Sequence, residues 1–143
     1  MINREKLDEL KKNLLAQEYF EIYDYDHLIE CIEGDVICKA SSGDWQGDSW
    51  YLFKYNNMYG YLVFGWGSCS GCDALQGCTN VGDVEELLIH LNDSIIWKKE
   101  EEMLEYFKTK DWSVEFFYSY GNIDPNFNEF KNEVIVYLEQ DHV

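Results

Sequence analysis

Two aromatic and β-branched runs, Ser49–Tyr55 and Tyr59–Trp66, constrain the fold of this chain more than any other feature. They are joined through the pair Asn56-Asn57, and asparagine tolerates the left-handed backbone of a tight turn. The two runs therefore predict a β-hairpin. Because the second run is apolar on both faces, we expect it in the centre of a sheet, with helices covering one side and another layer covering the other.

Amphipathic helices are predicted on both sides of this hairpin in the sequence, because apolar residues recur there at spacings of three and four. We expect Gly82-Asp83 to supply the N-cap of the second helix and Asp124-Pro125 to cap the last one. The acids Glu100–Glu102 fit the first turn of the third helix. The apolar faces are Leu7, Leu10 and Leu14; Val84, Leu87, Leu88 and Leu91; Met103, Leu104, Tyr106 and Phe107; and Phe127, Phe130, Val134, Tyr137 and Leu138.

Shorter elements complete the predicted fold. We expect a short helix within Ile22–Ile32 and strands at Val36–Ala40, Ser94–Trp97 and Trp112–Tyr120. The chain has 143 residues, no internal repeat and a single proline, so no Pro-rich linker divides it. We therefore predict one compact α+β domain over residues 1–143, with a mainly antiparallel sheet around the central hairpin, packed by helices.

The charge of the chain restricts its partners. There are 28 acidic side chains against 11 basic ones, a formal net charge of −17, while a hydrophobic fraction of 46% argues against disorder. Such a chain lacks the cations that direct nucleic-acid binding requires, and an anionic membrane surface would repel it. No stretch has the length of a signal peptide or a transmembrane helix, so we predict a cytoplasmic protein.

The acidic residues are concentrated early in the chain. A solvated surface that maintains solubility is one interpretation. The other is that rigidly held carboxylates imitate a phosphate backbone and occupy the cationic groove of a basic partner, namely a nucleic-acid-binding enzyme. An aromatic residue between two acids can supply an apolar anchor. The predicted partner-binding residues are Asp24, Asp26, Glu30, Glu33, Asp35, Asp44, Trp45 and Asp48.

Three of the five cysteines lie within one glycine-rich loop. Cys69, Cys72 and Cys78 have a spacing that can converge on one zinc ion, so zinc is a possible cofactor. A fourth ligand would have to come from Cys31, Cys38, His27, His90 or a carboxylate. The alternative is that no cofactor binds and that the cysteines are small buried side chains under a tight glycine turn.

Catalysis by a thiol is the remaining alternative for this loop. If the loop leads into a helix near Cys72, the amide dipoles of that helix would lower the pKa of the thiol. A thiol enzyme also needs a base, and His27 and His90 are the internal candidates. Because the sequence contains no complete catalytic set, we assign no catalytic residue and favour a protein that is not an enzyme.

The run Gly-Trp-Gly-Ser-Cys-Ser-Gly-Cys-Asp-Ala-Leu-Gln at positions 65 to 76, with Gly47-Asp48-Ser49 before it, resembles a motif of small uncharacterised proteins of bacteria and their phages. The resemblance covers residues 44 to 112 and implies a cytosolic protein encoded by a phage or mobile element. The resemblance implies no activity; the charge of −17, the foldable composition and the incomplete catalytic set lead us to interpret the chain as an anti-defence inhibitor that binds a host defence nuclease as a nucleic-acid mimic. A zinc-stabilised, cysteine-rich binding domain and a small thiol-dependent enzyme are the alternatives.

Overall fold

The computed structural model describes residues 1–42, 47–67, 73–112 and 124–140. The chain divides into two compact units, each formed by two separate stretches of sequence. Unit 1 consists of residues 1–33 and 66–94, and unit 2 consists of residues 34–65 and 95–143. The prediction of one domain over the whole chain stays a prediction.

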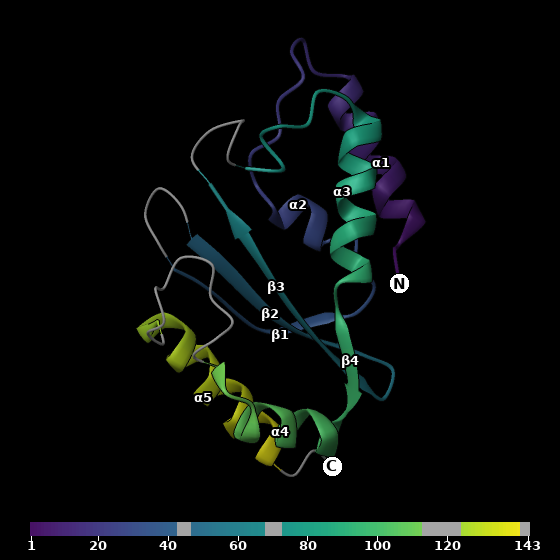
Figure 1. Ribbon diagram of the computed structural model, residues 1–143. Helices are drawn as coiled ribbons and strands as arrows, with labels where there is room; N and C mark the ends of the chain where they lie inside the picture. The colour runs from purple at the N-terminus through teal and green to yellow at the C-terminus, as the bar shows by residue number, and fades with distance from the viewer. Residues whose placement is uncertain (43–46, 68–72, 113–123, 141–143) are drawn as a thin grey trace. The chain divides into compact units, whose positions relative to one another are not determined.

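A four-stranded antiparallel sheet forms the centre of unit 2 (Figure 1). Its strands are β1 (Asp35–Ser41), β2 (Gly47–Tyr55), β3 (Met58–Trp66) and β4 (Ile96–Lys99), in the order β1-β2-β3-β4. The predicted hairpin is confirmed as β2 and β3, the two inner strands. Asn56, in the turn of this hairpin, adopts a left-handed backbone with φ of 55°. The sequence predicted this conformation, because asparagine tolerates it.

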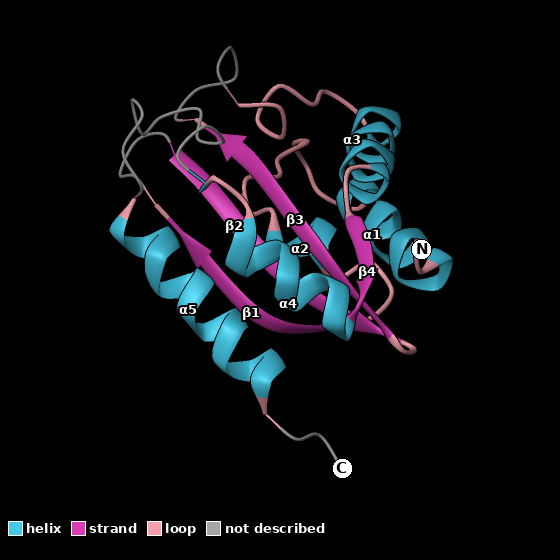
Figure 2. Ribbon diagram, turned by 60° about the horizontal axis from the view of Figure 1, so that its bottom comes forward, coloured by secondary structure: helices cyan, strands magenta, loops and turns pink. Residues whose placement is uncertain are grey.

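Two helices lie side by side on one face of this sheet (Figure 2). They are α4 (Glu100–Thr109) and α5 (Pro125–Glu139), and both were expected from their apolar spacing. The inner strands pack aromatic rings against them: the Trp50 ring centroid lies 5.2 Å from that of Phe127. Packed aromatic rings of this kind contribute beyond the area that they bury, so this face is the core of unit 2.

The edge strands of unit 2 were predicted less accurately than the hairpin. The expected strand Val36–Ala40 is confirmed as β1. Strand β4 begins two residues later than the expected Ser94, and Gly60 of β3 lies opposite Trp97. Of the expected strand Trp112–Tyr120, only its first residue belongs to the described part of the chain.

Unit 1 contains the remaining helices, α1 (Arg4–Leu15), α2 (Asp26–Ile29) and α3 (Val81–Asp93). Helices α1 and α3 lie side by side (Figure 1). One carboxylate of α3 joins them, because Glu85 accepts from Arg4 at 3.1 Å and forms an ion pair with Lys11 at 2.9 Å. None of the helices in the described ranges is long and apolar enough to cross a membrane.

The start of α3 differs from the prediction by two residues. The helix begins at Val81, and its N-cap is Asn80, whose side chain accepts from the Asp83 N–H at 2.9 Å. The Asp83 carboxylate in turn accepts from the Thr79 N–H at 3.0 Å. Asn80 and Asp83 are both capping residue types, and the structure assigns the cap to the first of them. The described residues just after Cys72 form a turn, and the next helix is α3.

Candidate functional site

Five of the predicted partner-binding acids lie on described parts of the chain near the surface. In unit 1, Asp24 and Glu30 are exposed, while Asp26 and Glu33 are half-buried, and all four lie in or beside α2. Asp35 is exposed at the start of β1 in unit 2. The structure therefore groups four of these acids on one segment of unit 1.

Of the remaining three predicted residues, only Asp48 belongs to the described part of the chain. Asp44 and Trp45 lie outside the described residues. Asp48 is described, and its side chain is fully buried, with 0% of its surface exposed. It lies near the start of β2, a strand that is buried on both faces. Asp48 is therefore not available to a partner at the surface of this structure, in contrast to the prediction.

Large apolar and aromatic side chains are exposed directly before these acids. Leu15, Tyr19 and Tyr23 are 71%, 73% and 65% exposed, the three highest values among the large hydrophobic residues described. Sequence reasoning did not single them out, because aromatic residues are usually expected in a core. The sequence feature that could have indicated their exposure is their position among acidic residues, not their residue type.

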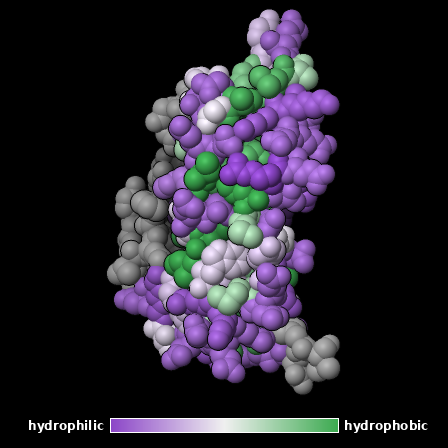
Figure 3. Space-filling model, turned by 90° about the vertical axis from the view of Figure 1, so that its right-hand side faces the viewer, coloured by the Kyte–Doolittle hydropathy of each residue, from purple (hydrophilic) through white to green (hydrophobic). Residues whose placement is uncertain are grey.

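The charges of unit 1 are distributed unevenly along the chain. All of its lysine and arginine residues lie in α1. The stretch from residue 16 to residue 33 contains six acids and no lysine or arginine. We call this stretch the acidic segment; its acids are Glu18, Glu21, Asp24, Asp26, Glu30 and Glu33. The face of the molecule in Figure 3 is mainly hydrophilic, with hydrophobic patches within it.

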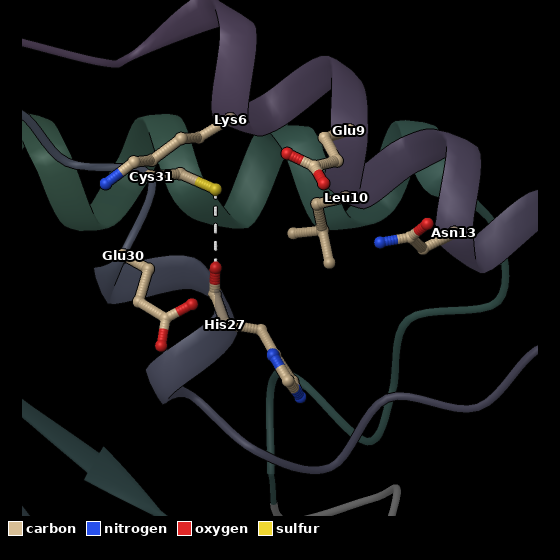
Figure 4. Close-up of a pocket in the computed structure, with 7 residues that line it drawn as sticks. All are labelled: Lys6, Glu9, Leu10, Asn13, His27, Glu30 and Cys31. Atoms are coloured by element: carbon tan, nitrogen blue, oxygen red, sulfur yellow. Dashed lines mark hydrogen bonds between the residues drawn. The ribbon is translucent and has the colours of Figure 1, made fainter.

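The acidic segment borders a groove along α1. Two hollows of about 280 and 360 Å³ lie there and share Leu10, Asn13 and His27 in their walls. Figure 4 shows the first hollow, which is lined by four residues of α1, by His27 of α2, and by Glu30 and Cys31 directly after α2. We call the two hollows together the α1 groove. Its other walls are Lys6, Glu9, Leu14, Gln17, Glu21, Ile22, Tyr23, Asp24, Glu30 and Cys31.

A buried hydrogen-bond cluster holds the acidic segment in place. The Tyr25 hydroxyl donates to Oδ1 of Asp73 at 2.9 Å and accepts from the Leu75 N–H at 3.2 Å. Burial raises the pKa of Tyr25, and the hydrogen bond to Asp73 raises it further. The phenol therefore stays protonated and keeps donating at physiological pH. This bond ties the segment to the glycine-rich loop of the same unit.

The same carboxylate closes the base of that loop. Asp73 also accepts from the N–H groups of Gly67 at 2.9 Å, Leu75 at 2.8 Å and Gln76 at 3.2 Å. The Gln76 side-chain amide donates to the Gly67 carbonyl at 3.1 Å. Gly67, Asp73 and Gln76 of the motif are thus held together by hydrogen bonds between side chains and main-chain groups. A buried carboxylate that accepts from several N–H groups stabilises the local fold, because it satisfies donors that would otherwise be buried without a partner.

The described cysteines do not have the properties of reactive thiols. Cys69 and Cys72 lie outside the described residues. Cys78 is half-buried, and its Sγ donates to the Ala74 carbonyl at 3.4 Å. Burial raises the pKa of Cys78, as it does for the buried thiols Cys31 and Cys38. Without a bound metal, these three thiols are therefore less readily ionised than an ordinary cysteine, whereas a catalytic nucleophile is a thiolate.

The proposed zinc ligands and catalytic bases are placed as follows. Within the described ranges, no three residues of the types His, Cys, Asp and Glu are grouped so as to hold a metal ion. His90 is exposed on α3. His27 is exposed on α2, and its carbonyl accepts from the Cys31 thiol at 3.3 Å (Figure 4). The zinc site stays a prediction, since two of its three cysteines are not described.

The chemistry of the acidic segment follows from its side chains. Exposed carboxylates accept charge-assisted hydrogen bonds from arginine and lysine, and an exposed tyrosine ring can stack on a guanidinium group. A hollowed surface beside them can take an aliphatic or aromatic side chain. The arrangement is therefore suited to binding a basic surface.

The chain matches no protein-family model, no curated protein and no solved structure.

Proposed function

We propose that this protein is an acidic interaction protein that binds a basic, nucleic-acid-binding enzyme and blocks its nucleic-acid site. One observation carries the proposal: the acidic segment combines six acids, no lysine or arginine, and the exposed rings of Tyr19 and Tyr23, of which Tyr23 lines the α1 groove. The acids would replace phosphates in the partner's site, and the tyrosines would supply apolar contacts.

The charge of the whole chain supports the same function. A net charge of −17 attracts a cationic groove over a distance of about 8 Å at physiological ionic strength and speeds the encounter. The contacts that then hold the complex are local. They depend on desolvated carboxylate–arginine pairs and on buried aromatic anchors rather than on the total charge.

The class of partner follows from the same chemistry. An enzyme that binds the phosphate backbone presents closely spaced arginine and lysine side chains, which are the complement of the acidic segment. The resemblance of the loop motif to proteins of bacteria and their phages makes a host defence nuclease the partner that we propose. An inhibitor of this kind acts in the cytosol of the host.

The proposal is tested by neutralising the segment without changing its shape. The variant Asp24→Asn/Asp26→Asn/Glu30→Gln removes three charges, and asparagine at position 24 keeps the hydrogen bond to the Asp26 N–H. The matched control is Glu101→Gln/Glu102→Gln/Glu105→Gln, which removes three exposed charges from α4. Affinity is measured by biolayer interferometry against a panel of purified bacterial defence nucleases at about 150 mM salt.

We expect the segment variant to lose at least about tenfold in affinity for its nuclease, which corresponds to about 1.4 kcal/mol, while the α4 control changes by less than about twofold. Equal losses in both variants would mean that diffuse charge, rather than this segment, binds the partner. The proposal is wrong if the unmodified chain binds none of the nucleases.

A further inference from the structure

A second groove lies in unit 2, between strand β1 and helix α5. It has a volume of about 670 Å³. Figure 2 shows α5 running beside β1, and Cys38 is the residue of β1 that lines the groove. The walls contributed by α5 and its C-terminal end are Glu129, Asn132, Glu133, Val136, Tyr137 and Gln140. We call this the β1–α5 groove.

Strand β1 is at the edge of the sheet. Its hydrogen-bonded neighbour is β2, and no other described strand pairs with its outer side. An edge strand presents main-chain N–H and C=O groups to which a further strand can be added. Strand β1 has seven residues, which is sufficient to pair with an extended peptide.

The charged side chains that line the groove are acidic, and the others are neutral. Glu129 and Glu133 are exposed in its wall, and no described lysine or arginine lines it. Val136 of the wall is 57% exposed, and Val36 of β1, which does not line the groove, is 42% exposed. Exposed valines at an edge strand and its neighbouring helix indicate a surface that can still bury apolar area.

From these observations we propose that the β1–α5 groove binds an extended basic peptide, which adds to the sheet as a strand beside β1. The main-chain groups of the peptide pair with the outer side of β1. The side chains of the added strand alternate between the two faces of the sheet, and the cationic ones that face α5 contact Glu129 and Glu133. This site is in unit 2 and does not depend on the function proposed for the acidic segment.

A second copy of the chain is a less suitable occupant than a basic peptide. Pairing β1 with its own copy would bring two molecules of charge −17 together. It would also place the glutamates of two grooves close to one another, and like charges that approach at an interface cost affinity. A peptide rich in lysine or arginine instead neutralises Glu129 and Glu133.

Two fluorescein-labelled octapeptides test the proposal. One alternates lysine and valine, and the other alternates lysine and proline, which has the same charge but cannot donate main-chain hydrogen bonds at every second position. Binding to the full chain is measured by fluorescence polarisation at about 150 mM salt. Hydrogen exchange of residues 35–41 is measured with and without each peptide.

We expect the lysine–valine peptide to bind at least about tenfold more tightly than the lysine–proline peptide, and to slow hydrogen exchange within β1. Equal affinities of the two peptides would overturn the proposal, because they would show attraction by charge alone. Slowed exchange that spares residues 35–41 would overturn it as well.

A pair of variants locates the site. Glu129→Lys/Glu133→Lys reverses two charges of the groove, and Glu101→Lys/Glu105→Lys reverses two exposed charges on α4 as a matched control. The groove variant is expected to lose at least about tenfold in affinity for the lysine–valine peptide, against less than about twofold for the control. Equal losses in the two variants would contradict the proposed position. Thermal unfolding of each variant checks that it remains folded.

Discussion

Asp48 shows how strongly one side chain depends on its surroundings. Its carboxyl group is fully buried, and neither oxygen has a hydrogen-bond partner among the described residues. Burial raises its pKa from 3.8 to about 6, and the nearby charge of Asp124 adds to the shift. A buried carboxylate without partners is costly when ionised, so the folded protein favours the protonated form.

This shift predicts a specific dependence of stability on pH. Because the pKa of Asp48 is higher in the folded state than in the unfolded state, its contribution is fully present below about pH 4 and is lost as the pH rises through about 6. The loss is about 3 kcal/mol at most. In Asp48→Asn this dependence is absent. Relative to the unmodified protein, the free energy of unfolding of the variant should therefore improve by about 2 kcal/mol between pH 4 and pH 7.5.

Urea denaturation of both proteins at the two pH values measures this difference. Comparing the two proteins cancels the effect of the other acids, which titrate in both. A difference that is the same at pH 4 and pH 7.5 would show that Asp48 is not protonated preferentially in the folded state.

Gly60 is required by close packing in unit 2. A Cβ atom at this position would lie 2.7 Å from Cγ2 of Ile95 and 2.8 Å from Cζ3 of Trp97. We predict that Gly60→Ala lowers the free energy of unfolding by about 1–3 kcal/mol, because the neighbours must move. Gly82→Ala is the control, since its nearest atom is Oδ1 of Asn80 at 3.0 Å and it should change stability by less than about 1 kcal/mol. Equal effects in a denaturant titration would contradict the account.

Single residues were the hardest features to predict from the sequence. Asp48 was assigned to a partner-binding surface as one of the two acids that flank Trp45, and its burial follows from the position of β2 inside the sheet. Tyr19 and Tyr23 were not identified, because no periodicity distinguishes an exposed aromatic residue from a buried one. In each case the deciding information was the tertiary packing.

At the level of elements, the hydrogen bonds of Asp73 at the base of the glycine-rich loop stabilise the fold of unit 1. Asp73 connects Gly67 at the start of the loop with Gln76 after it, and Tyr25 connects this base to the acidic segment. Removing the carboxylate leaves several buried donors without an acceptor, and such groups are costly. The position of the acidic segment should therefore depend on a residue of the glycine-rich loop.

A double-mutant cycle tests this connection. Tyr25→Phe, Asp73→Asn and the double variant should show a coupling energy of about 1–2 kcal/mol in denaturant unfolding, because the two residues share a hydrogen bond of 2.9 Å. Tyr25→Phe combined with Asp83→Asn serves as the control. Asp83 bonds to Thr79 rather than to Tyr25, so those two effects should add within about 0.5 kcal/mol. Additivity in both cycles would contradict the account.

The elements with strong periodicity were predicted correctly, and so was the start of α5 at Asp124-Pro125, whereas the starts of α3 and β4 were misplaced by two residues. The spacing of Leu7, Leu10 and Leu14 was sufficient to predict α1, and Asn56-Asn57 was sufficient to place the hairpin turn. The start of α3 was misplaced because two capping residues compete there. The β1–α5 groove was not predictable, because it depends on which strand lies at the edge of the sheet and beside which helix.

For the whole molecule, the net charge of −17 is expected to reduce stability by self-repulsion. Sodium chloride screens such repulsion, with a Debye length that falls from about 30 Å at 0.01 M to about 10 Å at 0.1 M. We therefore predict that the free energy of unfolding rises by about 1 kcal/mol or more between these concentrations. Urea titrations at both concentrations measure it. If the free energy of unfolding is unchanged or lower at 0.1 M sodium chloride, repulsion between the acids does not destabilise the folded chain.

The fold class was predictable for the molecule as a whole, whereas its function was not. An antiparallel sheet with a central hairpin and packing helices follows from the patterns of apolar residues. A binding surface requires knowing which acids share one exposed segment, and the sequence alone did not separate Asp24 and Glu30 from Asp48. Among the described residues, the structure removes Asp48 from the candidate surface, and our proposal places the interface on the acidic segment.

The most direct test of the central claim is competition between this protein and DNA for one nuclease. A complex of the protein with its nuclease is titrated with a labelled DNA duplex, and the bound DNA is followed by fluorescence anisotropy. If the protein occupies the nucleic-acid site, the apparent Kd for DNA rises in proportion to the concentration of the protein, and the segment variant raises it far less. A ternary complex of protein, nuclease and DNA with unchanged DNA affinity would contradict the claim.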